Sequence, residues 1–242
     1  MGQVWGNLTE MGDAGGIVFS ILHATARVPD GWQEAWIEWS RNWDGTPAEW
    51  LVAVEERDWE SVKQFWKGDW AGMTKGRIPV RTVLQAGISG SAVANWNTAA
   101  RFSVGGVLIM GADDFMAPPH WDTELLRVMG SCNEREFVIH VNTNSSRDNE
   151  LMSHVFMSRA VFERWGYFLY PGYTQMFCDD DATAHAKAEK LVIRAPHLVF
   201  EHQHFTLGKR ARDAVYAHGN RPQAFQEGNA IFLRRRKGGF VD

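Results

Sequence analysis

The stretch GVLIMGADD, residues 106–114, joins a short apolar run to two adjacent carboxylates. A short apolar run bounded by glycine is typical of a strand that is buried on both faces of a parallel sheet. Asp113 and Asp114 stand where such a strand would end. Because ligands of open α/β sheets gather beyond the carboxyl ends of the strands, the stretch predicts a central strand with a ligand site beside it.

Apolar runs and helical patterns alternate on the N-terminal side of this stretch. We predict strands at residues 17–22, 50–54, 80–85 and 106–111, with helices at residues 31–43, at residues 58–67 and around residues 93–104. Strands that alternate with helices imply a parallel sheet with right-handed crossovers. The first half of the chain therefore predicts an α/β, Rossmann-like fold.

Tryptophan is unusually common, with twelve in the chain. Trp32, Trp36, Trp39 and Trp43 are spaced by four, three and four residues, which places them on one face of a helix. Such a face is typical of core packing, and the alternative is that one or two of these rings stack on a sugar.

The pattern becomes mixed after Pro118 and Pro119. We expect a strand at residues 137–141, a helix that follows the acidic triplet Asp179–Asp181 and runs to about residue 191, a strand at residues 198–201 and a helix pair at residues 209–236. With helices and strands no longer in strict alternation, this part of the chain predicts a mixed region attached to the parallel sheet.

No internal repeat or long linker divides the chain, so we expect a single domain at residues 16–242. Residues 1–15 are rich in glycine and lack periodicity, which predicts a loose N-terminal arm. Within the domain we expect a nucleotide-binding half at residues 16–118 and an acceptor and catalytic half at residues 119–242.

The composition, with 45% hydrophobic and 22% charged residues, is that of an ordinary globular protein. It excludes the disordered and fibrous classes. The net charge of -4 also excludes a global basic field of the kind that drives non-specific binding of nucleic acid. The run Arg234–Lys237 is a local basic candidate, and a solvated chain end is its alternative interpretation.

The two cysteines, Cys132 and Cys178, lie far apart and form no CxxC pair. This spacing indicates neither a disulfide framework nor a thiolate zinc site, and it fits a reducing compartment. The sequence has no apolar run of the roughly 18 residues that a membrane span requires and no signal peptide at its start. We expect a cytoplasmic protein without a membrane span.

Three groups of polar residues could carry chemistry. Two adjacent carboxylates repel each other, so Asp113 and Asp114 make physical sense with a divalent cation or a ribose hydroxyl between them. A turn or a helix cap is the alternative. His202 and His204 alternate in a predicted strand, which points both rings to one side and suits a metal. Structural histidines are the competing interpretation.

The third group is the acidic triplet Asp179–Asp181, which directly precedes an alanine-rich helix. Carboxylates at a helix N-terminus are stabilised by the helix dipole, and this explains at least one of the three. A second could act as a general base toward a hydroxyl group.

These motifs, in this order, resemble the GT-A-fold glycosyltransferases, in particular family-two-like inverting enzymes and their short relatives encoded in phage genomes. The resemblance covers about residues 16–236. It rests on SILHATAR, VAVEERD, NWNTAA followed by GVLIMGADDFMAPPHWD, SRAVFERWGYFLYPGY before the acidic triplet, and EHQH. It implies a mostly parallel central sheet flanked by helices, a mixed acceptor side and C-terminal helices.

The resemblance also implies how the donor is bound. Thr25, Arg27 and Asn95 would line the nucleotide pocket, and Glu55 or Glu56 would face the base. A UDP-sugar is the expected donor, and the transferred group would be a hexose or a pentose.

Asp113 and Asp114 take the place of the family's Asp-x-Asp motif, which holds the ribose and the Mn²⁺ or Mg²⁺ that bridges the diphosphate. His204, together with His202, would complete this metal site. The chain departs from the motif at Phe115, which stands where many relatives have a further acid.

One member of the acidic triplet would be the catalytic base, with Asp180 preferred and Asp179 next. In the implied reaction a nucleoside diphosphate leaves with charge that a divalent ion can neutralise, while an activated hydroxyl attacks the anomeric carbon from the opposite face. The configuration would invert.

Two other functions use the same groups. A nucleotidyltransferase or a metal-dependent phosphoesterase could place Asp and His residues at the same sheet edge, and a non-catalytic nucleotide- or glycan-binding module would need only the pocket. For a glycosyltransferase of phage type, working in the host cytoplasm, the acceptor could be a hydroxylated DNA base, a protein or a surface glycan. A DNA acceptor would give the run Arg234–Lys237 phosphates to bind and would link the chain to DNA modification.

Overall fold

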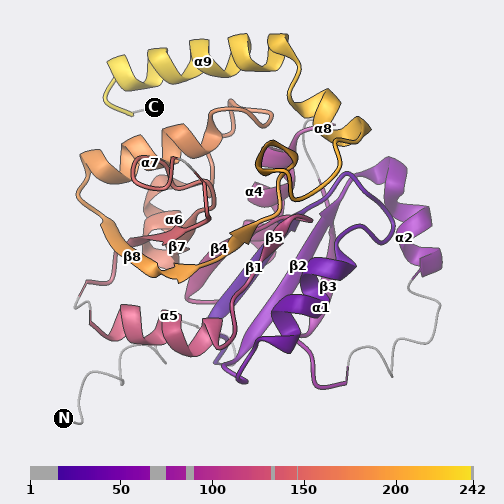
Figure 1. The fold of residues 1–242 in the computed structure, drawn as a ribbon. Coiled ribbons are helices and arrows are strands. Elements are labelled where there is room, and N and C mark those ends of the chain that lie inside the picture. Colours follow the sequence, from indigo (N-terminus) through magenta and orange to yellow (C-terminus); the bar gives the residue numbers. More distant parts are fainter. Residues whose placement is uncertain (1–15, 66–74, 86–89, 132–133, 146, 241–242) are drawn as a thin grey trace.

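The structure is a computed structural model that describes residues 16–65, 75–85, 90–131, 134–145 and 147–240 (Figure 1). The predicted N-terminal arm, the last residues of the predicted helix at 58–67 and Cys132 lie outside the described residues. Within the described residues, no helix is both long enough and apolar enough to cross a membrane.

The described strands form one seven-stranded sheet and one two-stranded sheet. The large sheet has the order β3-β2-β1-β4-β7-β6-β8, and β7 alone runs antiparallel to its neighbours. Its strands are β1 Phe19–Ala24, β2 Ala48–Val54, β3 Val80–Leu84, β4 Val107–Gly111, β6 Val138–Asn142, β7 Phe156–Ser158 and β8 Val192–Val199. The predicted α/β fold with a mostly parallel central sheet is confirmed.

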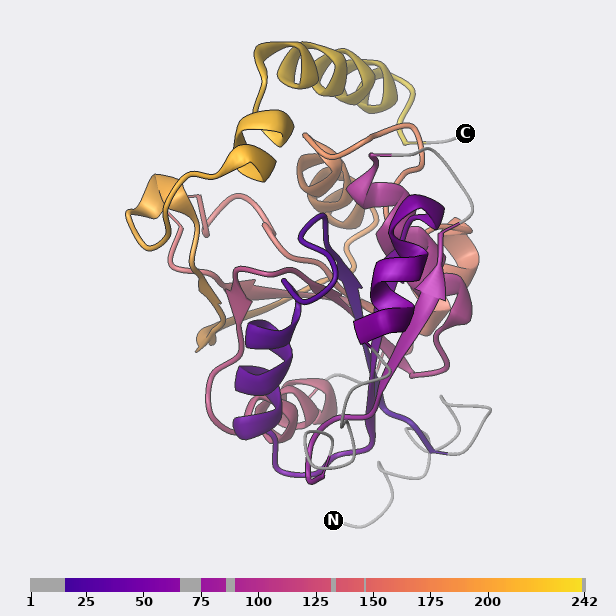
Figure 2. The same ribbon diagram turned by 90° about the vertical axis from the view of Figure 1, so that its right-hand side faces the viewer.

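The small sheet pairs β5 with β9, and helices cover both faces of the large sheet (Figures 1 and 2). The small sheet consists of β5 Phe115–Met116 and β9 Glu201–His202. The helices are α1 Gln33–Arg41, α2 Trp59–Phe65, α4 Ala92–Phe102, α5 Trp121–Gly130, α6 Arg159–Trp165, α7 Cys178–Ala188, α8 Ala214–Gly219 and α9 Pro222–Lys237.

The central strands β1, β2 and β4 are buried along their whole length. In β4, Val107 and Ile109 belong to one core cluster, whereas Leu108 and Met110 belong to a second. Because successive side chains of a strand point to opposite faces, the uninterrupted apolar run fills both cores. This explains why the prediction from GVLIMG was correct.

The first core cluster lies between the sheet and helices α1 and α5, and it is rich in tryptophan. Trp32, Trp36 and Trp39 are at most 1% exposed, which confirms core packing for these three. Trp43 lies beyond the end of α1 and only packs against the edge of this cluster. The second cluster holds the buried sides of α4, α6 and α7.

The predicted strand at residues 198–201 was wrong in its bounds. The structure has a longer strand, β8, that ends at Val199, and the pair Glu201–His202 belongs to the small sheet. Pro196 lies inside β8, where it interrupts the apolar pattern. A proline is tolerated there because β8 is an edge strand.

The C-terminal part of the chain crosses the carboxyl edge of the sheet and then returns over the second layer. Figure 1 shows α8 beside the ends of the central strands and α9 lying over α7. Only the part of the predicted helix pair after residue 213 is helical. The preceding segment connects β9 to α8 and carries several of the contacts described next.

Candidate active site

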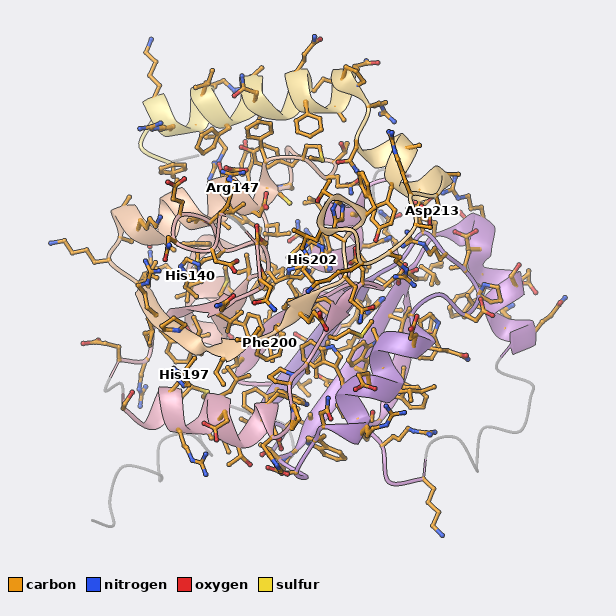
Figure 3. The ribbon with its side chains drawn as sticks, viewed as in Figure 1. His140, Arg147, His197, Phe200, His202 and Asp213 are labelled. Atoms are coloured by element: carbon orange, nitrogen blue, oxygen red, sulfur yellow. The ribbon has the colours of Figure 1, made fainter. Side chains whose placement is uncertain are left out.

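A cavity of about 540 Å³ opens at the carboxyl ends of β1, β2 and β4. Its walls include the first turns of α4 and α7 and parts of residues 202–220. This is the edge at which the sequence predicts a ligand site, and the chain brings distant segments together there. Figure 3 labels two residues of the segment from residue 202 to residue 220: His202 of β9, and Asp213, which immediately precedes α8.

Asp113 is held by three residues that follow or belong to β1. Its Oδ1 lies 2.8 Å from His23 Nε2, and its Oδ2 accepts hydrogen bonds from Thr25 at 3.0 Å and Arg27 at 2.8 Å. Burial opposes ionisation, but the hydrogen bonds and charges of His23 and Arg27 outweigh it and lower the pKa of Asp113. The carboxylate is therefore ionised and fixed in orientation.

The loop after β1 is shaped to present Arg27. The backbone N–H of Arg27 donates to Thr25 Oγ1 at 3.0 Å, and that of Gly31 donates to Arg27 O at 2.6 Å. A Cβ on Gly31 would lie 2.2 Å from Arg27 Cβ, so only glycine fits this close approach. The side chain of Arg27 also reaches Asp213 at 2.8 Å and thereby joins the β1 loop to the start of α8.

Asp114 faces the C-terminal segment instead. Its Oδ2 accepts a 2.6 Å hydrogen bond from the hydroxyl of Tyr216 in α8 and lies 3.4 Å from His202 Nε2. Burial raises the pKa of Asp114, but the hydrogen bonds from His202 and Tyr216 and the charge on His202 reverse the effect and bring it well below the usual range. Arg210 adds a 2.8 Å hydrogen bond to the backbone carbonyl of Asp113.

The donor groups for a metal are a pair, the carboxylate of Asp114, whose Oδ2 holds Tyr216 and whose Oδ1 accepts no hydrogen bond from the described residues, and Nε2 of His202. No group of three His, Cys, Asp or Glu side chains within the described residues is arranged to hold a metal. Magnesium in nucleotide sites is bound by one or two carboxylates, with substrate phosphates and waters supplying the rest, and imidazole is a common ligand of transition metals. The pair therefore fits the protein's share of a metal–nucleotide site, whereas both oxygens of Asp113 are already engaged.

His204 lies in the cavity wall but not in the predicted strand. Strand β9 ends at His202, and His204 caps the 3₁₀ turn Phe205–Leu207, with its Nδ1 2.8 Å from Thr206 Oγ1. The two imidazole rings nevertheless lie side by side, with centroids 5.0 Å apart. The expectation of one shared strand was wrong, because the chain turns at Gln203.

The acidic triplet at the start of α7 points in three directions. Asp179 lines the cavity, and burial together with the neighbouring charge of Asp180 raises its pKa to about 6. Asp180 pairs with Arg147 at 2.7 Å and is not part of the cavity wall. Asp181 is 1% exposed and turns toward α9. Only Asp179 is therefore placed to contact a ligand in this cavity.

Of the two glutamates that were predicted to face the nucleobase, only one lies in the cavity wall. Glu55 is buried in the cavity wall, where its Oε1 accepts a 2.6 Å hydrogen bond from Gly90 N–H, whereas Glu56 is exposed and lies outside the wall. The predicted residues that the cavity brings together are Thr25, Arg27, Glu55, Asn95, Asp113, Asp114, Asp179, His202 and His204.

Sequence reasoning missed Tyr216 and His154, which also line the cavity. Tyr216 stands in a short helix whose place was predicted only as part of a longer helix pair. His154 precedes β7, a strand that the pattern did not reveal. A histidine directly before the apolar residues Val155 and Phe156 was the one available signal.

Three solved structures have folds similar to this chain. The mannosyltransferase PcManGT from Pyrobaculum calidifontis, in complex with GDP-Man and Mn²⁺, is 16% identical, with a TM-score of 0.54 over 93% of this chain and 76% of its own. Residues 1–349 of S. aureus TarS in complex with UDP-GlcNAc are 12% identical, with a TM-score of 0.64 over 90% of this chain and 66% of the other. A further TarS structure is 11% identical, with a TM-score of 0.60, and the alignment covers 90% of this chain and 39% of the TarS chain.

These likenesses show that the chain has the GT-A glycosyltransferase fold. No protein-family model and no curated protein matches the sequence. At this level of identity the comparison concerns the fold, and the function has to be argued from the cavity.

Proposed function

We propose that the chain is a metal-assisted glycosyltransferase that moves a sugar from a nucleotide-sugar to an acceptor hydroxyl with inversion. One observation carries the proposal: the same cavity holds the fixed acids Asp113 and Asp114 at the end of β4 and, on α7, the carboxylate of Asp179 with its raised pKa. Titratable groups whose environments drive their pKa values apart are typical of acid–base sites. The fold similarity to nucleotide-sugar-bound structures supports the proposal.

The donor side of the cavity is the edge formed by β2, β1 and β4. Glu55 at the end of β2 would face the nucleobase, and Thr25 and Arg27 would bind the ribose and phosphate region. Arg27 offers planar N–H donors that match phosphate oxygens. A UDP-sugar is the donor that we propose, and the transferred group is a hexose or a pentose.

Asp114 and His202 would hold Mn²⁺ or Mg²⁺ at the diphosphate. When bound there, such an ion would neutralise the charge that develops on the leaving diphosphate. The role of Asp113 is different, because its oxygens already hold Arg27, Thr25 and His23 in place. We therefore assign Asp113 to the orientation of the β1 loop.

Asp179 would be the catalytic base. It accepts the proton of the acceptor hydroxyl while the new bond to the anomeric carbon forms and the bond from that carbon to the diphosphate oxygen breaks. A carboxylate with a pKa of about 6 is ionised at neutral pH, and it is a stronger base than an ordinary aspartate. The sequence favoured Asp180, but the ion pair with Arg147 directs that side chain elsewhere.

A polyanionic acceptor, such as a hydroxylated base in DNA, fits the charge distribution. Basic residues outnumber acidic ones between residues 205 and 240, although the whole chain has a net charge of -4. The basic residues are Lys209, Arg210, Arg212, Arg221, Arg234, Arg235, Arg236 and Lys237, and the acidic residues are Asp213 and Glu227. If DNA is the acceptor, duplex binding will weaken steeply as salt is raised. If the acceptor is uncharged, its binding should not depend on the salt concentration in this way.

A thermal-shift panel of UDP- and GDP-sugars, with and without Mn²⁺, tests the proposal. We expect at least one nucleotide-sugar to raise the melting temperature, more strongly with Mn²⁺, and Asp114→Asn to remove the increment due to Mn²⁺. Transfer of a labelled sugar then identifies the acceptor. Pyrophosphate release from a nucleoside triphosphate, or phosphodiester cleavage, without sugar transfer would instead establish the nucleotidyltransferase or phosphoesterase alternative. Binding without turnover on a broad acceptor panel would indicate a binding module.

A further inference from the structure

Three buried polar atoms in the cavity wall have no hydrogen-bond partner among the described residues, and one of them, Arg27 Nη2, forms an ion pair with Asp213, which leaves Asn95 Oδ1 and His154 Nδ1 with neither kind of partner. Asn95 is 5% exposed and His154 is 3% exposed. Leaving a buried polar atom unsatisfied costs about 1–3 kcal/mol, and most such atoms in folded proteins are paired. Two in one cavity wall indicate that a polar ligand completes this part of the site.

The ring of His154 is held firmly from two sides. It stacks on Phe115 with centroids 3.5 Å apart and planes within 3°, and it meets His202 edge-on at 4.8 Å. Phe115 therefore covers one face of the ring, so His154 can border the cavity only through its edge or its other face. An imidazole fixed in this way presents its nitrogen atoms in defined directions, as a selective hydrogen-bonding group requires.

The sheet order places His154 on one side of the acidic pair. In the sequence of strands β2, β1, β4 and β7, the cavity residues are Glu55, then Thr25, then Asp113 and Asp114, and then His154. Met110 N–H donates to Val155 O at 2.9 Å, which places His154 beside the carboxyl end of β4, at the same edge. His154 and Glu55 therefore lie on opposite sides of the acidic pair.

If the base of a nucleotide-sugar lies at Glu55 and its diphosphate lies at Asp114 and His202, the molecule extends along this edge from β2 toward β7. The transferred sugar then lies on the side of His154. The unpaired atom of Asn95 is an acceptor, which needs an O–H or N–H donor and which phosphate oxygens would repel. Hydroxyl groups satisfy both orphan atoms, since a hydroxyl both donates and accepts.

We propose that His154 binds a hydroxyl group of the transferred sugar through Nδ1 and thereby helps to determine which sugar the enzyme accepts. This inference rests on the proposed function, because it takes the donor to be a nucleotide-sugar. It assigns to the residue before β7 a role in sugar selection that is separate from the binding of the nucleotide.

The test compares affinity for a nucleoside diphosphate with affinity for its sugar conjugate. Calorimetry with UDP, UDP-glucose and UDP-galactose, and with GDP and GDP-mannose, gives the contribution of the sugar in each series. His154→Phe retains a flat ring over Phe115 and removes both nitrogens. We expect it to weaken binding of the preferred nucleotide-sugar roughly tenfold, the loss of about one buried hydrogen bond, with affinity for the diphosphate unchanged.

His140 provides a matched control. It is also 3% exposed, it lies in β6 outside the cavity wall, and Figure 3 shows it apart from His202. His140→Phe is expected to leave the ratio of the two affinities unchanged. A second pair of variants covers the case in which His154→Phe does not fold: Asn at position 154 can place an amide near the Nδ1 position, whereas Gln places it near Nε2. His154→Asn should retain sugar affinity, and His154→Gln should lose it.

Three results would overturn the assignment: equal losses for diphosphate and sugar conjugate in His154→Phe, no loss for either, or the same selective loss in His140→Phe. If wild-type protein binds none of these nucleotides or nucleotide-sugars, the proposed function itself is wrong. The two failures are therefore distinguishable from the wild-type measurements alone.

Discussion

Two acidic clusters of this chain, one at the end of β4 and one at the start of α7, use the same residue type in opposite ways. Asp113 and Asp114 both line the cavity, and hydrogen bonds from His23 and Arg27 to Asp113, and from His202 and Tyr216 to Asp114, lower the pKa of each carboxyl group. In the triplet Asp179–Asp181 only the first residue lines the cavity, and its pKa is raised to about 6.

The difference follows from the local backbone. Asp113 and Asp114 lie in the turn after a strand, where two neighbouring side chains can both reach the space beyond the sheet edge. Successive residues of a helix point about 100° apart, so the triplet sends one carboxylate to the cavity, one to Arg147 and one to Arg235. The number of acidic residues in a sequence motif therefore does not give the number of carboxylates that reach the site.

The largest expected effect is on catalysis at Asp179. Asp179→Asn removes the proposed base, so we expect kcat to fall by about 10²- to 10⁴-fold, the usual contribution of general base catalysis. Donor binding should change little, and it can be followed by calorimetry in the same variant. A transfer rate within a factor of three of wild type would remove Asp179 from the mechanism.

The next effect concerns the stability of the fold. Arg235 and Asp181 form a 2.9 Å ion pair in which both residues are at most 5% exposed. Arg235→Ala leaves the Asp181 carboxylate buried without its cation, which typically costs about 3–5 kcal/mol. Urea unfolding should show this loss, with the exposed neighbour Arg236→Ala within about 0.5 kcal/mol of wild type as the control. Equal small effects would mean that Asp181 is solvated.

A smaller loss is expected at the other cluster. Tyr216→Phe removes the 2.6 Å hydrogen bond to Asp114. A hydrogen bond to a charged group contributes about 1.5–3 kcal/mol, so the free energy of unfolding should fall by that amount in the absence of ligand. The same denaturation experiment measures it. An unchanged free energy would show that α8 is not anchored by this contact.

The pH dependence of transfer should follow Asp179. A base must be deprotonated to act, so kcat should rise with pH through about 6 and level off above it. Between pH 5 and pH 7 the expected change is about tenfold, from the ionised fraction at each pH. The acids of the β4 cluster, with lowered pKa values, should add no step in this window. A profile that is flat from pH 5 to 7 would contradict the assignment of the base.

Asp180→Asn is the smallest expected change and the matched control for Asp179→Asn. The ion pair of Asp180 with Arg147 is largely exposed on the arginine side, and such pairs contribute about 0–1 kcal/mol. We expect near-normal stability and kcat above pH 7. Because a neighbouring negative charge would be gone, the rise of kcat should move to lower pH. A large loss of kcat would restore Asp180 as the candidate base.

The sequence was informative wherever a strand is buried on both faces. The apolar run before Asp113 and the spacing of Trp32, Trp36 and Trp39 placed β4 and α1 correctly, because burial alone determines those patterns. Strand β8 was misplaced because an edge strand tolerates Pro196 and partial exposure. The short strand β7 could not be found, since three residues give no periodicity.

The site was predictable to the level of the sheet edge. Residues after β1, β2 and β4 were expected together because parallel strands end at one edge, and Thr25, Glu55 and Asp113 do line one cavity. The choice among neighbouring acids was not predictable, because it depends on partners such as Arg147 that are distant in sequence. Tyr216 was missed for the same reason, since its contact joins residues 102 positions apart.

The anchoring of α8 has a consequence for ligand affinity. Tyr216 and Asp213 hold α8 through Asp114 and Arg27, which are groups that the donor is proposed to use. A donor that binds through either group competes with α8 for it. By thermodynamic linkage, the equilibrium constant for holding α8 in its present position lowers the apparent affinity for such a donor by the same factor. Mutations in α8 can therefore tighten donor binding without adding a contact to the donor.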